Sequence, residues 1–134
     1  MLKKLDTIQK RNNLNEVYRT DIKGPGGGYH RYFVVPYGEP CMDIVEDAPD
    51  CVPASAVCVV LFQNGPRRLD TSEHGVLDSD LLEIVRDRLK AFQTGEYATR
   101  ENACAITHIE EALMWMNKRA EDRAARGVLG TTEK

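Results

Sequence analysis

The segment from Thr99 to Arg126 constrains the fold most, because its residues repeat at the spacing of one long helix. Successive members of the repeat are four, three, four, three and four residues apart: Asn102, Ile106, Ile109, Leu113, Met116 and Ala120. A repeat of this kind places its members in one seam, as in a coiled coil. Gly127 follows at the position where a left-handed residue ends many helices. The sequence therefore predicts a helix over 99–126.

A shorter helix is predicted upstream, beginning at Asp78 or Ser79 and ending at Phe92. Either of the first two residues can serve as the N-cap, and Asp80 and Glu83 would lie near the positive end of the helix dipole. The apolar residues of this segment fall on one face of the helix: Leu81, Leu82, Val85, Leu89 and Phe92.

The TGEY sequence at 94–97 predicts a turn between these two helices. Helices joined by about six residues pack antiparallel as a hairpin. The seam of the longer helix extends past the length that the shorter helix can cover. The excess seam favours a partner chain, most simply in a homodimer formed through the helices.

The N-terminal half is predicted to form a small antiparallel β-sheet, with strands near 14–21, 29–35 and 54–63. The last of these, ASAVCVVLFQ, is nearly continuous in apolar residues. Such a strand is predicted to be central in the sheet or buried on both faces. The GPGGG cluster at 24–28 interrupts regular structure and predicts a turn between strands.

Two segments of this half carry weaker signals. Residues 1–13 are polar, with Leu2, Leu5 and Ile8 at three-residue spacing, which fits either a short helix or a frayed arm. Residues 36–53 contain four prolines and an acidic group, which favours a loop with at most a short strand at 42–45.

These elements together predict an α+β fold, in which a small N-terminal antiparallel β-sheet precedes a long C-terminal helical hairpin that dimerises through its helices. A chain of 134 residues has the usual length of a single domain. We therefore predict one domain over 1–134, with its β-rich part at 15–76 and the hairpin at 78–127.

Composition narrows the possible functions. The chain is 42% hydrophobic and 29% charged, which is ordinary for a soluble protein. No apolar run approaches the length needed to cross a bilayer and the N-terminus has no apolar leader, so we expect a cytoplasmic protein without a membrane partner. The formal net charge of −3 argues against general nucleic-acid binding, which needs a broad basic surface.

Signals for catalysis or metal binding are weak. The four cysteines form no C-x-x-C pair and do not combine with histidines at zinc-ligand spacing, so they are predicted to be thiols without a metal. GPGGG lacks the G-K-[ST] ending of a phosphate-binding loop. No nucleophile has a base at diagnostic spacing. The sequence therefore predicts neither an enzyme nor a bound cofactor or metal.

Three arginines at i, i+4 and i+7 form a stripe on one face of the long helix: Arg119, Arg123 and Arg126. A row of guanidinium groups beside an apolar seam can hold phosphate, because each planar fork binds two oxygens. The alternative is a solvated edge whose arginines pair with the nearby acidic residues Glu111, Glu121 and Asp122.

Two further residues have open roles. Phe92 could stack on a base or could be a core residue at the end of its helix. Asn102 lies in the apolar seam, where its amide could contact a ligand or could fix the register of a dimer.

The region from Leu81 to Thr131 resembles the phage-encoded Thoeris anti-defence and anti-CBASS sponges. The shared motifs are F-Q-x-G at 92–95, R-E-N-A at 100–103, E-E-A-L-x-W at 110–115, the spaced arginines, and R-G-V-x-G-T at 126–131. The turn at 95–97 reads GEY where the family commonly has a proline and a phenylalanine. The sequence thus leaves the choice of ligand within the family open.

The resemblance implies a protein that binds a host immune signal and holds it without cleavage. The signal would be glycocyclic ADP-ribose in the Thoeris system or a cyclic di- or trinucleotide in the CBASS system. Such proteins assemble as homodimers and further into hexamers, with pockets at chain interfaces. By motif position, Phe92 would stack on adenine, Asn102 would make a polar contact, and Arg119 and Arg123 would bind the pyrophosphate.

Two other functions remain as alternatives. An oligomeric interaction or scaffold protein could use the same helical seam without any small ligand. A phosphodiesterase that degrades the messenger is the weaker alternative, because the sequence offers neither metal ligands nor a general base.

Overall fold

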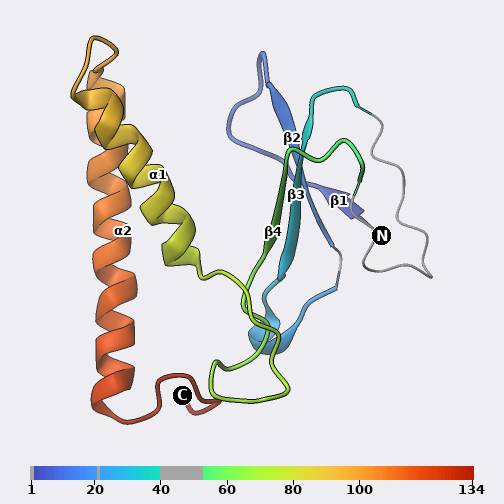
Figure 1. Cartoon of the computed structure of the whole chain (residues 1–134), viewed down its shortest axis with the longest axis vertical. Coiled ribbons are helices and arrows are strands. Elements are labelled where there is room, and N and C mark those ends of the chain that lie inside the picture. The colour runs from blue at the N-terminus through green and yellow to red at the C-terminus, as the bar shows by residue number, and fades with distance from the viewer. Residues whose placement is uncertain (1, 21, 40–52) are drawn as a thin grey trace. The chain divides into compact units, whose positions relative to one another are not determined.

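A computed structural model describes residues 2–20, 22–39 and 53–134 of the chain. The chain divides into two compact units: the first comprises Met1–Gly65 with Thr71–Gly75, and the second comprises Pro66–Asp70 with Val76–Lys134. The first unit holds the strands and the second holds the helices, which confirms the α+β class (Figure 1). The assignment of residues 1–134 to a single domain stays a prediction.

The first unit contains a four-stranded antiparallel sheet in the order β1-β2-β3-β4. Its strands are β1 (Leu2–Lys4), β2 (Asn15–Thr20), β3 (Arg31–Pro36) and β4 (Cys58–Leu61). The strands expected near 14–21 and 29–35 are therefore confirmed. The glycine-rich cluster between them contains one 3-10 turn at Pro25–Gly27, so the predicted turn between strands is also confirmed.

The core of this unit lies on the central strand β3. Phe33 and Val35 are fully buried, and their spacing of two residues places both side chains on one face of the sheet. Tyr18 of β2 pairs with Phe33, and Val59 of β4 pairs with it from the other side. Among the residues that the structure describes, the buried apolar core therefore consists of these two side chains of β3.

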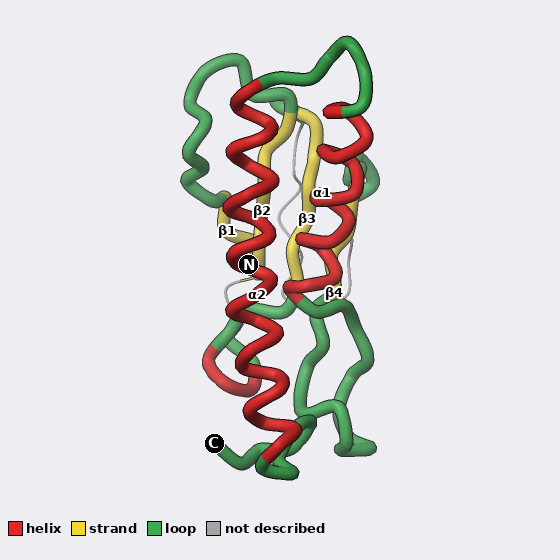
Figure 2. The backbone as a smooth tube through the Cα atoms, turned by 90° about the vertical axis from the view of Figure 1, so that its left-hand side faces the viewer, coloured by secondary structure: helices red, strands yellow, loops and turns green. Residues whose placement is uncertain are grey.

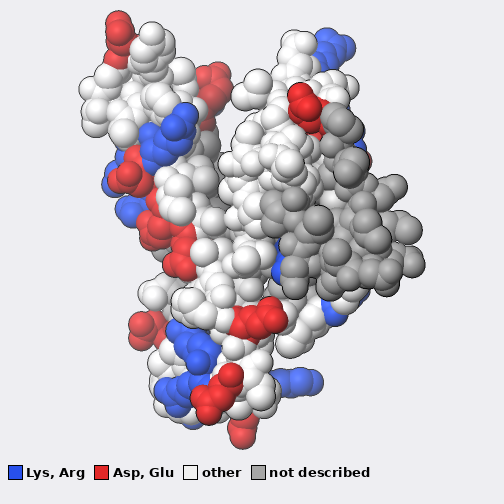
Figure 3. Space-filling model, turned by 45° about the vertical axis from the view of Figure 1, so that its right-hand side comes forward, with Lys and Arg blue, Asp and Glu red and all other residues white. Residues whose placement is uncertain are grey.

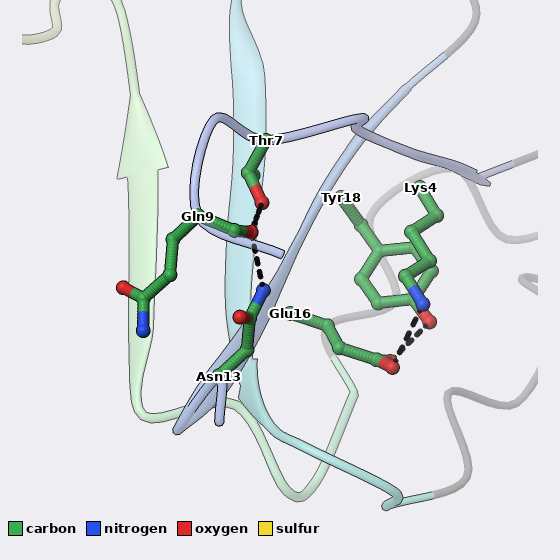
Figure 4. Close-up of polar contacts among 6 residues, drawn as sticks. All are labelled: Lys4, Thr7, Gln9, Asn13, Glu16 and Tyr18. Atoms are coloured by element: carbon green, nitrogen blue, oxygen red, sulfur yellow. Dashed lines mark hydrogen bonds and ion pairs between the residues drawn. The ribbon is translucent and has the colours of Figure 1, made fainter. Parts of the chain in front are cut away.

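The N-terminal segment differs from both structures expected for 1–13. Leu2–Lys4 forms strand β1, which pairs with the edge of β2, and the Leu5 amide donates to the Val17 carbonyl at 2.8 Å. Lys4 Nζ lies 2.9 Å from Glu16 Oε1, and the Tyr18 hydroxyl donates to the same carboxylate at 2.8 Å (Figure 4). Backbone pairing with a neighbouring strand overrode the weak helical spacing of this polar segment.

The strongest predicted strand was placed wrongly in the sheet. Over 54–63 only Cys58–Leu61 is a strand, and β4 lies at the edge of the sheet rather than at its centre. Val59 and Leu61 are 38% and 48% exposed, although an apolar run of this kind predicts burial. Apolarity alone therefore does not show which strand lies inside. The short strand considered at 42–45 lies outside the described residues, as do Cys41 and Cys51.

The second unit contains the predicted helical hairpin, formed by α1 (Asp78–Gln93) and α2 (Arg100–Ala125). The two helices run antiparallel and contact each other along α1 (Figures 1 and 2). None of the helices in the described part of the chain is both long enough and apolar enough to span a membrane.

The start of α1 differs in detail from the prediction. Leu77 is the N-cap, whereas Asp78 or Ser79 was expected. The capping hydrogen bond runs from the Leu77 amide to Asp80 Oδ2 at 2.9 Å, so a carboxylate inside the first turn replaces an acceptor on the N-cap itself. Asp80 still lies at the positive end of the helix dipole, as expected.

Both ends of α2 are closed by local hydrogen bonds. Thr99 is the N-cap, and its Oγ1 accepts from the Asn102 amide at 3.0 Å. At the C-terminus, Val128 N donates to Arg123 O and Gly127 N donates to Ala124 O, both at 3.0 Å. This pair of bonds is the Schellman motif, which requires the positive φ of 72° that Gly127 adopts.

Candidate functional site

The helical hairpin has no closed core of its own. No residue of α1 or α2 is fully buried, and most seam residues of α2 are only half-buried. Large apolar side chains remain outside: Met114 is 67% exposed and Trp115 is 72% exposed. A helix normally buries its apolar stripe against another element. The half-buried seam and the exposed apolar side chains beside it therefore form a candidate contact surface.

A groove of about 470 Å³ runs along the two helices. Its lining residues are Ser79, Glu83, Arg86, Glu110, Leu113, Met114, Met116, Asn117 and Ala120. Arg86 crosses from α1 to α2, where its Nη2 lies 2.8 Å from Glu110 Oε2. Hydrogen bonds to Glu110 and then to Glu83 raise the pKa of Arg86 above its usual value. None of the four residues predicted to bind ligand lines this groove.

Phe92 and Asn102 lie at the tip of the hairpin. The Gln93 side chain bridges the turn, accepting from the Thr99 amide at 2.9 Å and donating to the Thr99 carbonyl at 3.0 Å. Because Thr99 also caps Asn102, these contacts hold the end of α1 against the start of α2. The structure thus brings Phe92 and Asn102 to the same end of the hairpin.

The Phe92 ring is accessible for stacking. It is 37% exposed, and the Arg88 guanidinium lies over it at 5.1 Å from the ring centroid. Arg88 was not among the predicted site residues, although its i, i+4 spacing to Phe92 could have identified it. Asn102 is half-buried, and its side chain makes no hydrogen bond with the residues that the structure describes.

Arg119 and Arg123 lie near the other end of α2, in different surroundings. Arg119 is exposed and makes no hydrogen bond or ion pair with any described residue. Arg123 is half-buried, and its Nη2 donates to the Val128 carbonyl at 3.0 Å and to the Thr131 carbonyl at 3.2 Å. The sequence did not show this difference between two arginines on one helix face.

Two acidic neighbours of the arginine stripe contact other side chains of the described residues. Asp122 pairs with Lys118 at 2.9 Å, and Glu111 lies 3.7 Å from His108. Arg126 Nη1 donates to the backbone oxygen of Lys134 at 2.7 Å. Among the described residues the three arginines form no ion pair with Glu111, Glu121 or Asp122, while Arg119 and Arg126 are exposed, so the alternative of a solvated edge stays open. On the face that Figure 3 shows, blue and red side chains are interspersed over the helices, with no broad basic surface.

The two pairs of candidate residues are far apart within one chain. Asn102 and Arg119 are both on α2, seventeen residues apart, which is about 25 Å at about 1.5 Å per residue. Phe92 lies at the same end as Asn102. One chain therefore cannot place all four side chains around a single small ligand. A site that uses all four needs contributions from two chains.

Comparison with known proteins adds a second line of evidence. Residues 55–121 match the hairpin domain described as Acb2/Tad1. A protein named Thoeris anti-defense 1, from Bacillus phage SBSphiJ7, is 42% identical over 122 residues. That similarity covers 78% of this chain and 80% of the phage protein. Residues 55–121, which match the hairpin domain, include the hairpin tip and Arg119.

Proposed function

The chain belongs to the Acb2/Tad1 family of phage anti-defence proteins, and we propose that it binds and sequesters a nucleotide-derived immune signal without cleaving it. The signal is glycocyclic ADP-ribose, with cyclic di- and trinucleotides as further candidates. The name of the phage relative refers to the Thoeris system and favours the first of these. Sequestration of an intracellular signal requires the protein to be present in the host cytoplasm.

The observation that carries this proposal is the chemistry at the two ends of the hairpin. One end presents an accessible aromatic ring with a nearby amide, Phe92 with Asn102, and the other presents the exposed guanidinium of Arg119, which pairs with no described residue. A ring can stack on a base, and a guanidinium can bind phosphate oxygens in pairs. These groups match the two parts of a nucleotide.

The proposed pocket lies between two copies of the chain. Phe92 and Asn102 of one copy meet Arg119 and Arg123 of the other, because about 25 Å separates the two pairs in a single chain. The uncovered apolar residues of the hairpin supply a surface through which the copies associate. Dimers, and hexamers built from them, are part of the proposal.

The affinity that sequestration requires also favours a closed interface. A nanomolar dissociation constant corresponds to about −12 kcal/mol. Two charge-assisted contacts at about 1.5–3 kcal/mol each and one stacked base at about 1–3 kcal/mol fall short of that value. The remainder must come from a preorganised pocket from which a second chain excludes water. A monomer should therefore bind weakly.

A capture-and-release experiment tests the proposal. The purified protein is mixed with glycocyclic ADP-ribose and a panel of cyclic di- and trinucleotides, filtered, and then heat-denatured. Mass spectrometry should show one compound that disappears from the filtrate and returns intact on denaturation. Recovery of a cleaved product would contradict sequestration. Failure to deplete any compound at micromolar protein would contradict the proposed function.

A scaffold protein without a small ligand is the second candidate, because the exposed apolar surface of the hairpin suits protein contacts as well. The two functions differ in how they depend on Arg119. Substitution of Arg119 by alanine weakens capture by at least about tenfold in a sponge but has no effect on self-association in either case. A protein that self-associates and captures no nucleotide would favour the scaffold.

A further inference from the structure

The C-terminal segment folds back on the end of α2 and accepts hydrogen bonds from one arginine of that helix. Arg123 Nη2 donates to the carbonyls of Val128 and Thr131, at 3.0 and 3.2 Å. Thr131 closes the turn, since its Oγ1 and its amide both donate to the Val128 carbonyl, at 2.5 and 3.1 Å. We call residues 127–131 the C-terminal clasp. Its acceptors hold one nitrogen of the Arg123 guanidinium in place.

The clasp orients this guanidinium without neutralising it. Backbone carbonyls are neutral acceptors, so Arg123 keeps its full positive charge, whereas pairing with a carboxylate would cancel it. Within the described residues, Nε and Nη1 of Arg123 make no hydrogen bond. The side chain is therefore both ordered and still able to bind an anion through its other nitrogens.

Gly130 closes the clasp against a segment distant in sequence. Its carbonyl accepts from the Arg68 amide at 3.1 Å. Its φ is 79°, in the left-handed region, and a Cβ there would lie 2.5 Å from Arg67 Cγ and 3.0 Å from Arg68 Cγ. An alanine at 130 would therefore meet both a strained backbone and a steric clash.

We propose that the C-terminal clasp is a positioning device for Arg123, which presents the open side of its guanidinium to the phosphate groups of the ligand. The inference rests on the proposed sequestration of a nucleotide signal. Ordering a long side chain before binding removes part of the entropy cost of complex formation. Gly130 is then a positioning residue, because it acts on the ligand only through Arg123.

The test compares Gly130→Ala with Gly38→Ala. Gly38 has a φ of 81°, and a Cβ added there would meet no atom of the described residues within 4 Å, so its substitution imposes a similar backbone strain without touching the clasp. The first readout needs no ligand: it is the side-chain ¹H–¹⁵N spectrum, with the Arg123 signal assigned by its absence in Arg123→Lys. We expect a sharp, slowly exchanging Arg123 signal in the wild type and in Gly38→Ala, and its loss in Gly130→Ala.

The second readout is the affinity for the captured nucleotide, measured by titration calorimetry. We expect Gly130→Ala to bind about two- to tenfold more weakly than the wild type, and Gly38→Ala to bind as the wild type does. Thermal unfolding checks that both variants remain folded at the temperature of the titration, so that a difference in affinity is not a difference in folding.

Three results would overturn the inference. The first is a wild-type Arg123 signal that exchanges as rapidly as that of an exposed arginine. The second is a Gly130→Ala variant that binds the nucleotide as tightly as Gly38→Ala does. In both of these the wild type captures ligand, so the proposed function stands. The third is a wild type that captures no nucleotide, which contradicts the proposed function and this inference together.

Discussion

At the scale of single residues, the two arginines assigned to the ligand are not equivalent. Arg119 is exposed and unpaired among the described residues, whereas Arg123 binds backbone carbonyls of the C-terminal segment. Helical periodicity places both on one face of α2 but carries no information about the segment that folds back on one of them. Arg119 is therefore the cleaner probe of the proposed site.

We expect Arg119→Ala to weaken nucleotide capture by at least tenfold, because a charge-assisted contact contributes about 1.5–3 kcal/mol. The free energy of unfolding should change by less than about 0.5 kcal/mol, since the side chain is exposed and makes no hydrogen bond or ion pair with a described residue. Lys118→Ala is the control, because it removes a neighbouring exposed cation that pairs with Asp122. Equal loss of capture in both variants would show a general charge effect rather than a site.

A second prediction at the scale of single residues concerns how the free energy of unfolding depends on pH in the acid range. Hydrogen bonds from Lys4 and then from Tyr18 lower the pKa of Glu16, while the bond to Glu16 raises the pKa of Lys4. A carboxylate with a lowered folded-state pKa stabilises the fold above its usual value of 4.5, and this stabilisation is lost as pH falls through the lowered pKa.

Urea unfolding of the wild type and of Glu16→Gln, followed by circular dichroism from about pH 6 to about pH 3, measures this contribution. The wild type should be the more stable at the upper end, and the difference should shrink as the pH falls. A difference that stays constant over this range would show that the carboxylate charge is not responsible.

At the scale of elements, the hairpin turn depends on a few polar side chains. Thr99 caps α2, and Gln93 ties the end of α1 to Thr99 through two hydrogen bonds. The same contacts hold Phe92 and Asn102 at one end of the hairpin. The glutamine of the F-Q-x-G motif, Gln93, therefore has a structural role in the turn. The sequence alone did not show this role.

We expect Thr99→Ala to lower the free energy of unfolding of the helical unit by about 0.5–2 kcal/mol, the usual loss for a removed N-cap. Thr107→Ala is the matched control, because Thr107 lies inside α2 and its hydroxyl donates to the Ala103 carbonyl, away from the helix end. Chemical denaturation followed at the helical signal measures both. A smaller loss for Thr99→Ala than for Thr107→Ala would contradict the capping role.

At the scale of the whole molecule, the apolar surface of the hairpin is one feature that a single chain leaves exposed. Neither helix has a fully buried residue, and the seam residue Met116 is 36% exposed. The proposed pocket also needs residues from two copies, because its halves lie about 25 Å apart along α2. Self-association would satisfy both requirements.

We expect Met116→Glu to shift the protein towards monomers and to reduce nucleotide capture at the same time. A carboxylate placed in a dry interface should raise the dissociation constant of the oligomer by at least about a hundredfold. Lys118→Glu, an exposed change on the same helix, should leave assembly intact. Sedimentation velocity measures the assembly, and a monomeric variant that still captures nucleotide tightly would contradict a site shared between chains.

Sequence patterns by themselves determined the α+β class, both helices to within a residue or two, and the two central strands, because hydrophobic spacing and turn residues act locally. They also identified the candidate residues of both hairpin ends. Only the tertiary structure decided that Leu2–Lys4 pairs as a strand, that β4 lies at the edge of the sheet, and that Arg123 is held by the C-terminal clasp. The first two depend on pairing between segments distant in sequence, and the third depends on how the chain reverses after α2. None of these contacts leaves a periodic signal in the chain.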